Sequence, residues 1–243
     1  LWVAMVDYRE EVKIGQQILA RVIEAYRKIR NTLRILVANL YDFDPTVDAL
    51  ENDQLQEVDR YALARYGQVA TRVLQAYDRY EFQSAVHALN HYLTVDLSAF
   101  YIDISKDRLY TLRPGSNARR SAQTTMHTIV NGLTRLLAPI LPITADELWR
   151  NVPGTDSDSV HLADFPSGPE SLVDTELLSR WTHLLGLRDA VNGELEKLRQ
   201  DKVVGTSLEA SVTLTADGQL ANLLDQYRDE LSTLFITSEV KVT

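Results

Sequence analysis

The stretch that decides the fold is Ile14–Tyr41, IGQQILARVIEAYRKIRNTLRILVANLY. Its apolar side chains recur at steps of three and four residues, at Ile18, Val22, Ala25, Ile29, Leu33, Leu36 and Leu40. Because an α-helix turns once in 3.6 residues, this spacing predicts one apolar stripe along a long helix. Proline cannot continue the helical hydrogen bonds, so Pro45 and the acidic residues before it should end the helix.

A helix with one apolar stripe needs partners, and the same periodicity predicts three more long helices downstream. They should span residues 52–80, 82–109 and 118–137. Asn52 is the expected N-cap of the second, and Gly67 inside it predicts close packing or a bend. Thr144 with Glu147 predicts a capping box at the start of a further short helix. Four helices joined by short turns predict an antiparallel bundle over residues 14–150.

The last part of the chain has a different pattern. Residues 151–171 are rich in Pro, Gly, Ser and Asp and are predicted to form a linker, with a short extended piece at Val160–Leu162. Residues 172–243 should contain a long helix followed by a small α/β module. Its predicted elements are a helix over 172–202, a strand over 210–215, a helix over 220–235 and a strand through Val240 and Val242. The fold class is therefore mainly α, a helical bundle with a small α/β module.

Composition is that of a soluble globular protein. Hydrophobic residues make up 45% of the 243 positions, and no apolar run is long enough to span a membrane. We expect a cytoplasmic protein with no membrane partner. The chain has no cysteine, which excludes disulfides and thiolate metal sites. Residues 151–243 carry seven basic and sixteen acidic side chains, the whole net charge of −9, so the first 150 residues can still present a positive face.

The common catalytic signatures are missing. There is no GxGxxG or GxxxxGK[ST] loop, no GxSxG elbow and no HExxH pair, so no catalytic site is expected in this chain. His87 and His91 are four residues apart and could share one helix face as metal ligands, but no third ligand is evident. An uncharacterised enzyme with a metal at these histidines stays open as an alternative.

Two basic clusters indicate a polyanionic partner. The first gathers on the opening helix, opposite its apolar stripe, and consists of Arg27, Lys28, Arg30, Asn31 and Arg34. The second surrounds the turn between the third and fourth helices and consists of Lys106, Arg108, Arg113, Arg119 and Arg120. In an antiparallel bundle that turn can lie beside the end of the opening helix, so both clusters could meet at one tip. A solvated face of the bundle is the alternative interpretation of each.

Several motifs resemble the anticodon-binding region of bacterial-type isoleucyl-tRNA synthetases. The resemblance covers nearly the whole chain in order, and its segments are DYREEV at 7–12, AYRKIRNTLR at 25–34, NLYDFDP at 39–45, FYIDISKDRLY at 100–110, RRSAQ at 119–123, LAPILP at 137–142, ADELW at 145–149 and KVVGTSLEA at 202–210. The first segment is similar to the stretch that joins the catalytic domain to the bundle. Residues 1–13 are therefore expected to be the end of that connection.

The resemblance implies that the chain reads tRNA and does not catalyse aminoacylation by itself. The ATP and Mg²⁺ site and the editing domain would lie upstream in the same polypeptide, and a cysteine zinc module would lie past Thr243. The partner would be an isoleucine-accepting tRNA, and the protein a monomer. Arg27, Arg30 and Arg34 would hold phosphates, while Asn31 and Tyr41 could meet bases. A valyl-type fragment, or a helical strut with no tRNA affinity of its own, remain alternatives.

Overall fold

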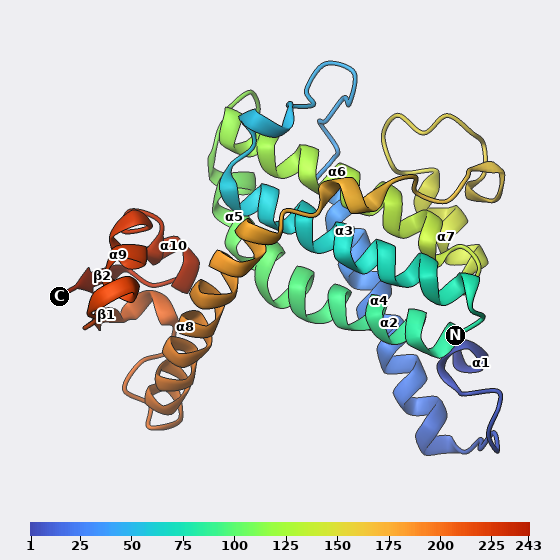
Figure 1. Cartoon of the computed structure of the whole chain (residues 1–243), viewed down its shortest axis with the longest axis horizontal. Helices are drawn as coiled ribbons and strands as arrows, with labels where there is room; N and C mark the ends of the chain where they lie inside the picture. Colours follow the sequence, from blue (N-terminus) through green and yellow to red (C-terminus); the bar gives the residue numbers. More distant parts are fainter. The chain divides into compact units, whose positions relative to one another are not determined.

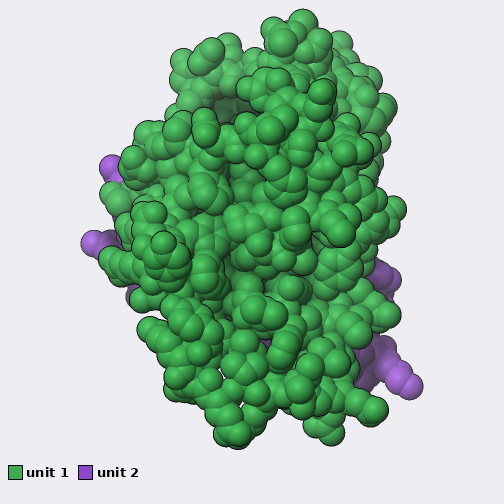
Figure 2. All heavy atoms as spheres, turned by 90° about the vertical axis from the view of Figure 1, so that its right-hand side faces the viewer, with its two compact units in different colours: residues 1–175 green, residues 176–243 purple.

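The computed structural model describes residues 1–243, which form two compact units, residues 1–175 and residues 176–243 (green and purple in Figure 2). The first unit is helical (Figure 1). Its main helices are α1 (Trp2–Met5), α2 (Gln16–Ala38), α3 (Glu57–Asp78), α4 (Phe82–His91), α5 (Ile102–Thr111), α6 (Asn117–Leu137) and α7 (Pro142–Trp149). The predicted helical bundle is confirmed. None of the chain's helices combines the length and apolar character that crossing a bilayer requires.

The centre of the bundle is formed where α3 and α4 lie side by side and α6 packs on both α2 and α3 (Figure 1). Side chains such as Leu33, Leu93 and Leu133 are fully buried there. The predicted stripe of α2 is buried only from Ile29 onward, and no residue before it in this helix is buried. Periodicity predicted which face of α2 is apolar, but the packing partners cover only its second half.

The third predicted helix is continuous from α4 to α5, but its middle is wider than an α-helix. Tyr92–Tyr101 forms a π-helical segment, η2, and buries Tyr92, Leu93, Leu97, Phe100 and Tyr101. A π-turn holds one residue more than an α-turn and is rare. The apolar spacing of this segment fits both helix types, so the sequence did not distinguish them.

Two predicted helix starts are wrong. Asn52 does not cap α3: residues Asn52–Gln54 form a separate 3-10 turn, η1, with a capping box between Glu51 and Gln54, and α3 begins later, at Glu57. Thr144 does not open α7 either, because the helix begins at Pro142, whose fixed φ suits a first helical position. The Thr144 hydroxyl instead lies 3.1 Å from the Tyr26 hydroxyl on α2.

Gly67 confirms the predicted close packing. The 3-10 turn η4 (Pro169–Leu172) crosses α3 at this point. A Cβ on Gly67 would lie 2.6 Å from the Pro169 carbonyl oxygen, so only glycine lets the two backbones approach this closely.

The segment between α7 and η4 packs back onto α7. The Trp149 indole donates to the Ser157 carbonyl at 2.9 Å, and the Ser159 hydroxyl donates to Asp146 at 2.6 Å. Val160–Leu162, predicted to be extended, is a 3-10 turn, η3. The Ser159 side chain accepts from the His161 amide, which favours a turn over a strand.

The second unit contains α8 (Thr175–Gln200) and the predicted small α/β module. Strands β1 (Ser211–Leu214) and β2 (Glu239–Val242) pair in parallel, with Ser211 opposite Glu239. The single predicted connecting helix is two helices, α9 (Gly218–Gln226) and α10 (Leu231–Phe235). A short 3-10 turn, η5 (Ser207–Glu209), precedes β1.

Candidate nucleic-acid interface

The opening helix presents a row of basic side chains because its opposite face is buried. Ile29, Thr32, Leu33 and Leu36 are buried in the core, which places the opposite face of the helix outside. Arg27, Lys28, Asn31 and Arg34 are exposed, and the Arg30 side chain is 34% exposed. The first predicted cluster is thus one continuous surface on α2.

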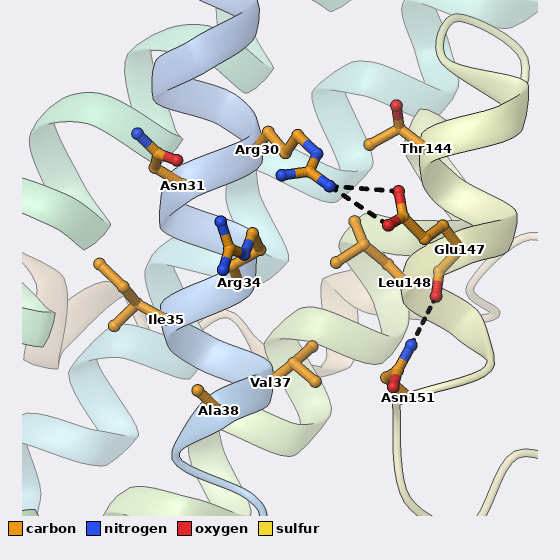
Figure 3. Close-up of a pocket in the computed structure, with 10 residues that line it drawn as sticks. All are labelled: Arg30, Asn31, Arg34, Ile35, Val37, Ala38, Thr144, Glu147, Leu148 and Asn151. Atoms are coloured by element: carbon orange, nitrogen blue, oxygen red, sulfur yellow. Dashed lines mark hydrogen bonds and ion pairs between the residues drawn. The ribbon is translucent and has the colours of Figure 1, made fainter.

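This surface borders a groove between α2 and α7 (Figure 3). The groove has a volume of about 610 Å³ and is lined by Arg30, Asn31, Arg34, Ile35, Val37, Ala38, Thr144, Glu147, Leu148 and Asn151. Its lining combines aliphatic and polar side chains from both helices. It can therefore contact both the flat face and the polar edge of a planar ligand.

Charged groups face each other across the groove. Figure 3 shows Arg30 reaching from α2 toward Glu147 on α7, and its guanidinium lies 3.2 and 3.5 Å from the two carboxylate oxygens. Arg34 makes no ion pair with any residue, so its charge is available to a ligand. The Asn151 amide nitrogen donates to the Glu147 carbonyl at 2.8 Å, which leaves its side-chain oxygen as an acceptor.

The second basic cluster reaches the end of α2, as predicted, but mostly through internal ion pairs. Arg119, only 4% exposed, contacts Asp42 at 2.9 Å, and Arg120 contacts Asp48 at 3.2 Å. These bonds place the start of α6 beside the end of α2. Lys106 pairs with Asp103, while Arg113 is exposed. Contact of this cluster with RNA stays a prediction, and most of its charge is already paired within the protein.

Arg108 belongs to a buried network that the sequence did not predict. Its guanidinium donates to both oxygens of Asp59, at 2.7 and 2.9 Å, and Asp59 is fully buried on α3. The hydroxyls of Tyr101 and Ser121 donate to the same carboxylate at 2.6 and 2.5 Å. Burial alone would lower the pKa of Arg108, but its hydrogen bonds with Asp59 and the charge of that residue raise it. The network joins three helices and the π segment.

Two exposed tyrosines lie near the end of α2. Tyr41 is 80% exposed, so its ring is not packed beneath the helix end, and the Arg119 guanidinium lies 5.8 Å from the ring centre. Arg119 also donates to the Tyr41 hydroxyl at 3.3 Å. Tyr110 is 65% exposed, and its hydroxyl lies 3.5 Å from the Asn39 amide nitrogen. Sequence reasoning did not single out Tyr110, although it closes a resembling motif.

The histidine pair lies elsewhere. His87 and His91 are exposed on α4 and line a groove with Arg65 and Arg72 of α3. No third His, Asp or Glu completes a metal site with them or anywhere else in the chain. Guanidinium groups are poor neighbours for a metal cation, so this groove does not favour the metalloenzyme alternative.

Comparison with known proteins adds independent information. The family model described as the anticodon-binding domain of tRNA ligase matches residues 59–214. The isoleucine–tRNA ligase of Syntrophotalea carbinolica is 47% identical over 243 residues, which is 100% of this chain and 26% of that protein. That of Geobacter sulfurreducens is 47% identical over 240 residues, 99% of the chain and 26% of the protein. The chain spans about a quarter of the length of the curated relatives it matches.

Proposed function

Because this chain belongs to the anticodon-binding domain family of tRNA ligases, we propose that it binds the anticodon stem-loop of an isoleucine-accepting tRNA within a longer isoleucine–tRNA ligase. The observation that carries the proposal is the exposed basic row on α2 beside the α2–α7 groove. ATP and Mg²⁺ would bind other parts of that longer protein, since no nucleotide-binding signature occurs in this chain.

Electrostatics supports binding despite the net charge of −9. The acidic excess belongs to residues 151–243, whereas the exposed face of α2 from Arg27 to Arg34 carries no acidic side chain. Phosphates attract Lys and Arg locally and release counterions on binding. If about four phosphates are neutralised, log affinity should fall with log salt at a slope of about −3.

The structure divides the predicted contacts by role. Arg27, Lys28 and Arg34 are free to hold phosphates, and Arg113 is exposed for the same purpose. Tyr41 would stack on an unpaired base. Arg119 would then be a positioning residue, because its guanidinium lies over the Tyr41 ring and donates to the Tyr41 hydroxyl. Arg108 and Arg120 are paired with carboxylates, so they would stabilise the packing of the helices and would not contact RNA.

Fluorescence anisotropy with a labelled isoleucine-tRNA anticodon stem-loop tests this proposal. The variant Arg30→Ala/Arg34→Ala should weaken binding and flatten the salt slope by one to two phosphate contacts, each contributing about 0.7–0.9 to the slope. Arg72→Ala removes one guanidinium from α3, outside this groove, and is the control for the loss of each positive charge. Absent binding, or equal effects of both variants, would overturn the proposal.

The same assay tests the two alternatives, which are a helical strut without tRNA affinity and a domain that binds valine tRNA. A strut would show no saturable binding, and any residual signal would vanish at modest salt. A valine-specific domain would bind the valine stem-loop more tightly than the isoleucine one. We expect the isoleucine stem-loop to bind more tightly, since the compared relatives carry that name.

A further inference from the structure

One acidic side chain stands in the otherwise basic groove between α2 and α7. The Glu147 side chain is 60% exposed and is held by Arg30 at 3.2 Å. An exposed ion pair of this kind stabilises a fold by only about 0–1 kcal/mol. A carboxylate also repels phosphates, so binding of the RNA phosphate backbone does not explain why a carboxylate lies beside Arg30 and Arg34. The position of Glu147 therefore suits a ligand group that donates a hydrogen bond to a carboxylate.

The charged donors line one wall of the groove and the charged acceptor lines the other. From α2 come the guanidinium groups of Arg30 and Arg34. From α7 comes the Glu147 carboxylate, and just past the helix end comes the side-chain oxygen of Asn151, whose amide nitrogen donates to the Glu147 carbonyl. A carboxylate has about four lone-pair positions, and the single Arg30 nitrogen that contacts its two oxygens occupies at most two of them. Because Glu147 lines the groove and its side chain is 60% exposed, it keeps acceptor capacity that a ligand can reach.

Both walls also carry aliphatic side chains. Ile35, Val37 and Leu148 line the same space of about 610 Å³. A nucleobase has an apolar face and a polar edge, and unpaired bases of RNA loops are commonly splayed out and bound in this way. The lining therefore suits a single base better than a phosphate alone.

We propose that the groove receives one unpaired base of the bound stem-loop, and that Glu147 accepts a hydrogen bond from the exocyclic amino group of that base. This rests on the proposed function. Adenine, cytosine and guanine carry such a group, whereas uracil has a carbonyl oxygen in its place and keeps only the N3–H donor between two carbonyl oxygens. Glu147 is then a specificity-determining residue, and Arg30 positions it while contacting the neighbouring backbone. A matched polar contact to a base edge discriminates by about tenfold.

The test couples changes in the protein to changes in the RNA. Each amino-bearing base of the anticodon loop is replaced singly by uracil, and every stem-loop is titrated against the unmodified protein and Glu147→Gln. Glutamine keeps the size and one acceptor but adds a donor that a carbonyl can meet. At one loop position, uracil should weaken binding to the unmodified protein about tenfold but to Glu147→Gln threefold or less.

Glu24→Gln is the matched control, because it removes the same charge from an exposed position on α2 outside the groove. It should shift all affinities equally and leave the discrimination at that loop position unchanged. Binding with less than twofold coupling to Glu147 at every loop position would overturn the inference while leaving the proposed function intact. Absence of any stem-loop binding would overturn both.

Discussion

Replacing Asp59 with alanine should be among the most destabilising single changes in the bundle. The carboxylate is fully buried and accepts from Tyr101, Ser121 and twice from Arg108. The substitution leaves the Arg108 guanidinium, whose side chain is 12% exposed, without its counter-charge. Breaking a buried pair by removing one partner costs about 3–5 kcal/mol, and the two hydroxyls lose their acceptor as well.

Urea denaturation followed by circular dichroism and fluorescence measures this loss. We expect Asp59→Ala to lower the free energy of unfolding of the bundle by at least about 3 kcal/mol and its melting temperature by about 10 °C. Asp103→Ala is the control, because its pair with Lys106 is exposed, and it should cost at most about 1 kcal/mol. A loss below about 1 kcal/mol for Asp59→Ala would refute the assignment of this network as the main polar tie between the helices.

Three further predictions test packing, alkaline stability and the proposed base contact. Gly67→Ala should destabilise the bundle by about 1–3 kcal/mol, because the added Cβ would meet the Pro169 carbonyl oxygen at 2.6 Å. In an exposed helix the same change would stabilise by about 1 kcal/mol. A variant that melts at a higher temperature than the unmodified protein would contradict this close approach. Burial raises the pKa of Tyr61 to about 12 and also raises the pKa of Tyr66. As the pH rises, the unfolded chain therefore releases these two protons before the folded chain does. The stability that the two tyrosines contribute is complete below about pH 10 and declines as the pH rises toward 12. Near-ultraviolet absorbance and urea titrations over this range check that sign, and constant stability up to pH 12 would disprove it. Tyr41→Ala should weaken stem-loop binding by about 1–3 kcal/mol without changing the melting temperature, since the ring is 80% exposed; unchanged anisotropy curves would exclude stacking at this position.

Local patterns predicted much of the architecture. The apolar spacing of Ile14–Tyr41 located α2, its buried face and hence its basic face, and the change of period near residue 210 located β1. Resembling motifs indicated the family before the comparisons showed it. These signals are available in sequence because a helix or strand repeats its geometry every few residues, so the face on which a side chain lies follows from spacing alone.

Spacing did not predict which charged side chains form ion pairs inside the protein. Arg108 and Arg119 were predicted to be surface cations. Their partners Asp59 and Asp42 lie 49 and 77 residues away along the chain. Glu147 read as a capping residue of its own helix, yet it faces Arg30 across 117 residues of chain. The widened turns of η2 were equally hidden, because apolar spacing fits two helix types.

The amino-acid sequence by itself determined where most of the long helices lie, their apolar faces, the small α/β module and the family. Only the tertiary structure decided which cations are neutralised, which tyrosines are exposed and where a groove opens between α2 and α7. The physical reason is range. Helical periodicity arises from bonds between residues three to five apart, whereas an ion pair or a groove depends on which distant elements pack together.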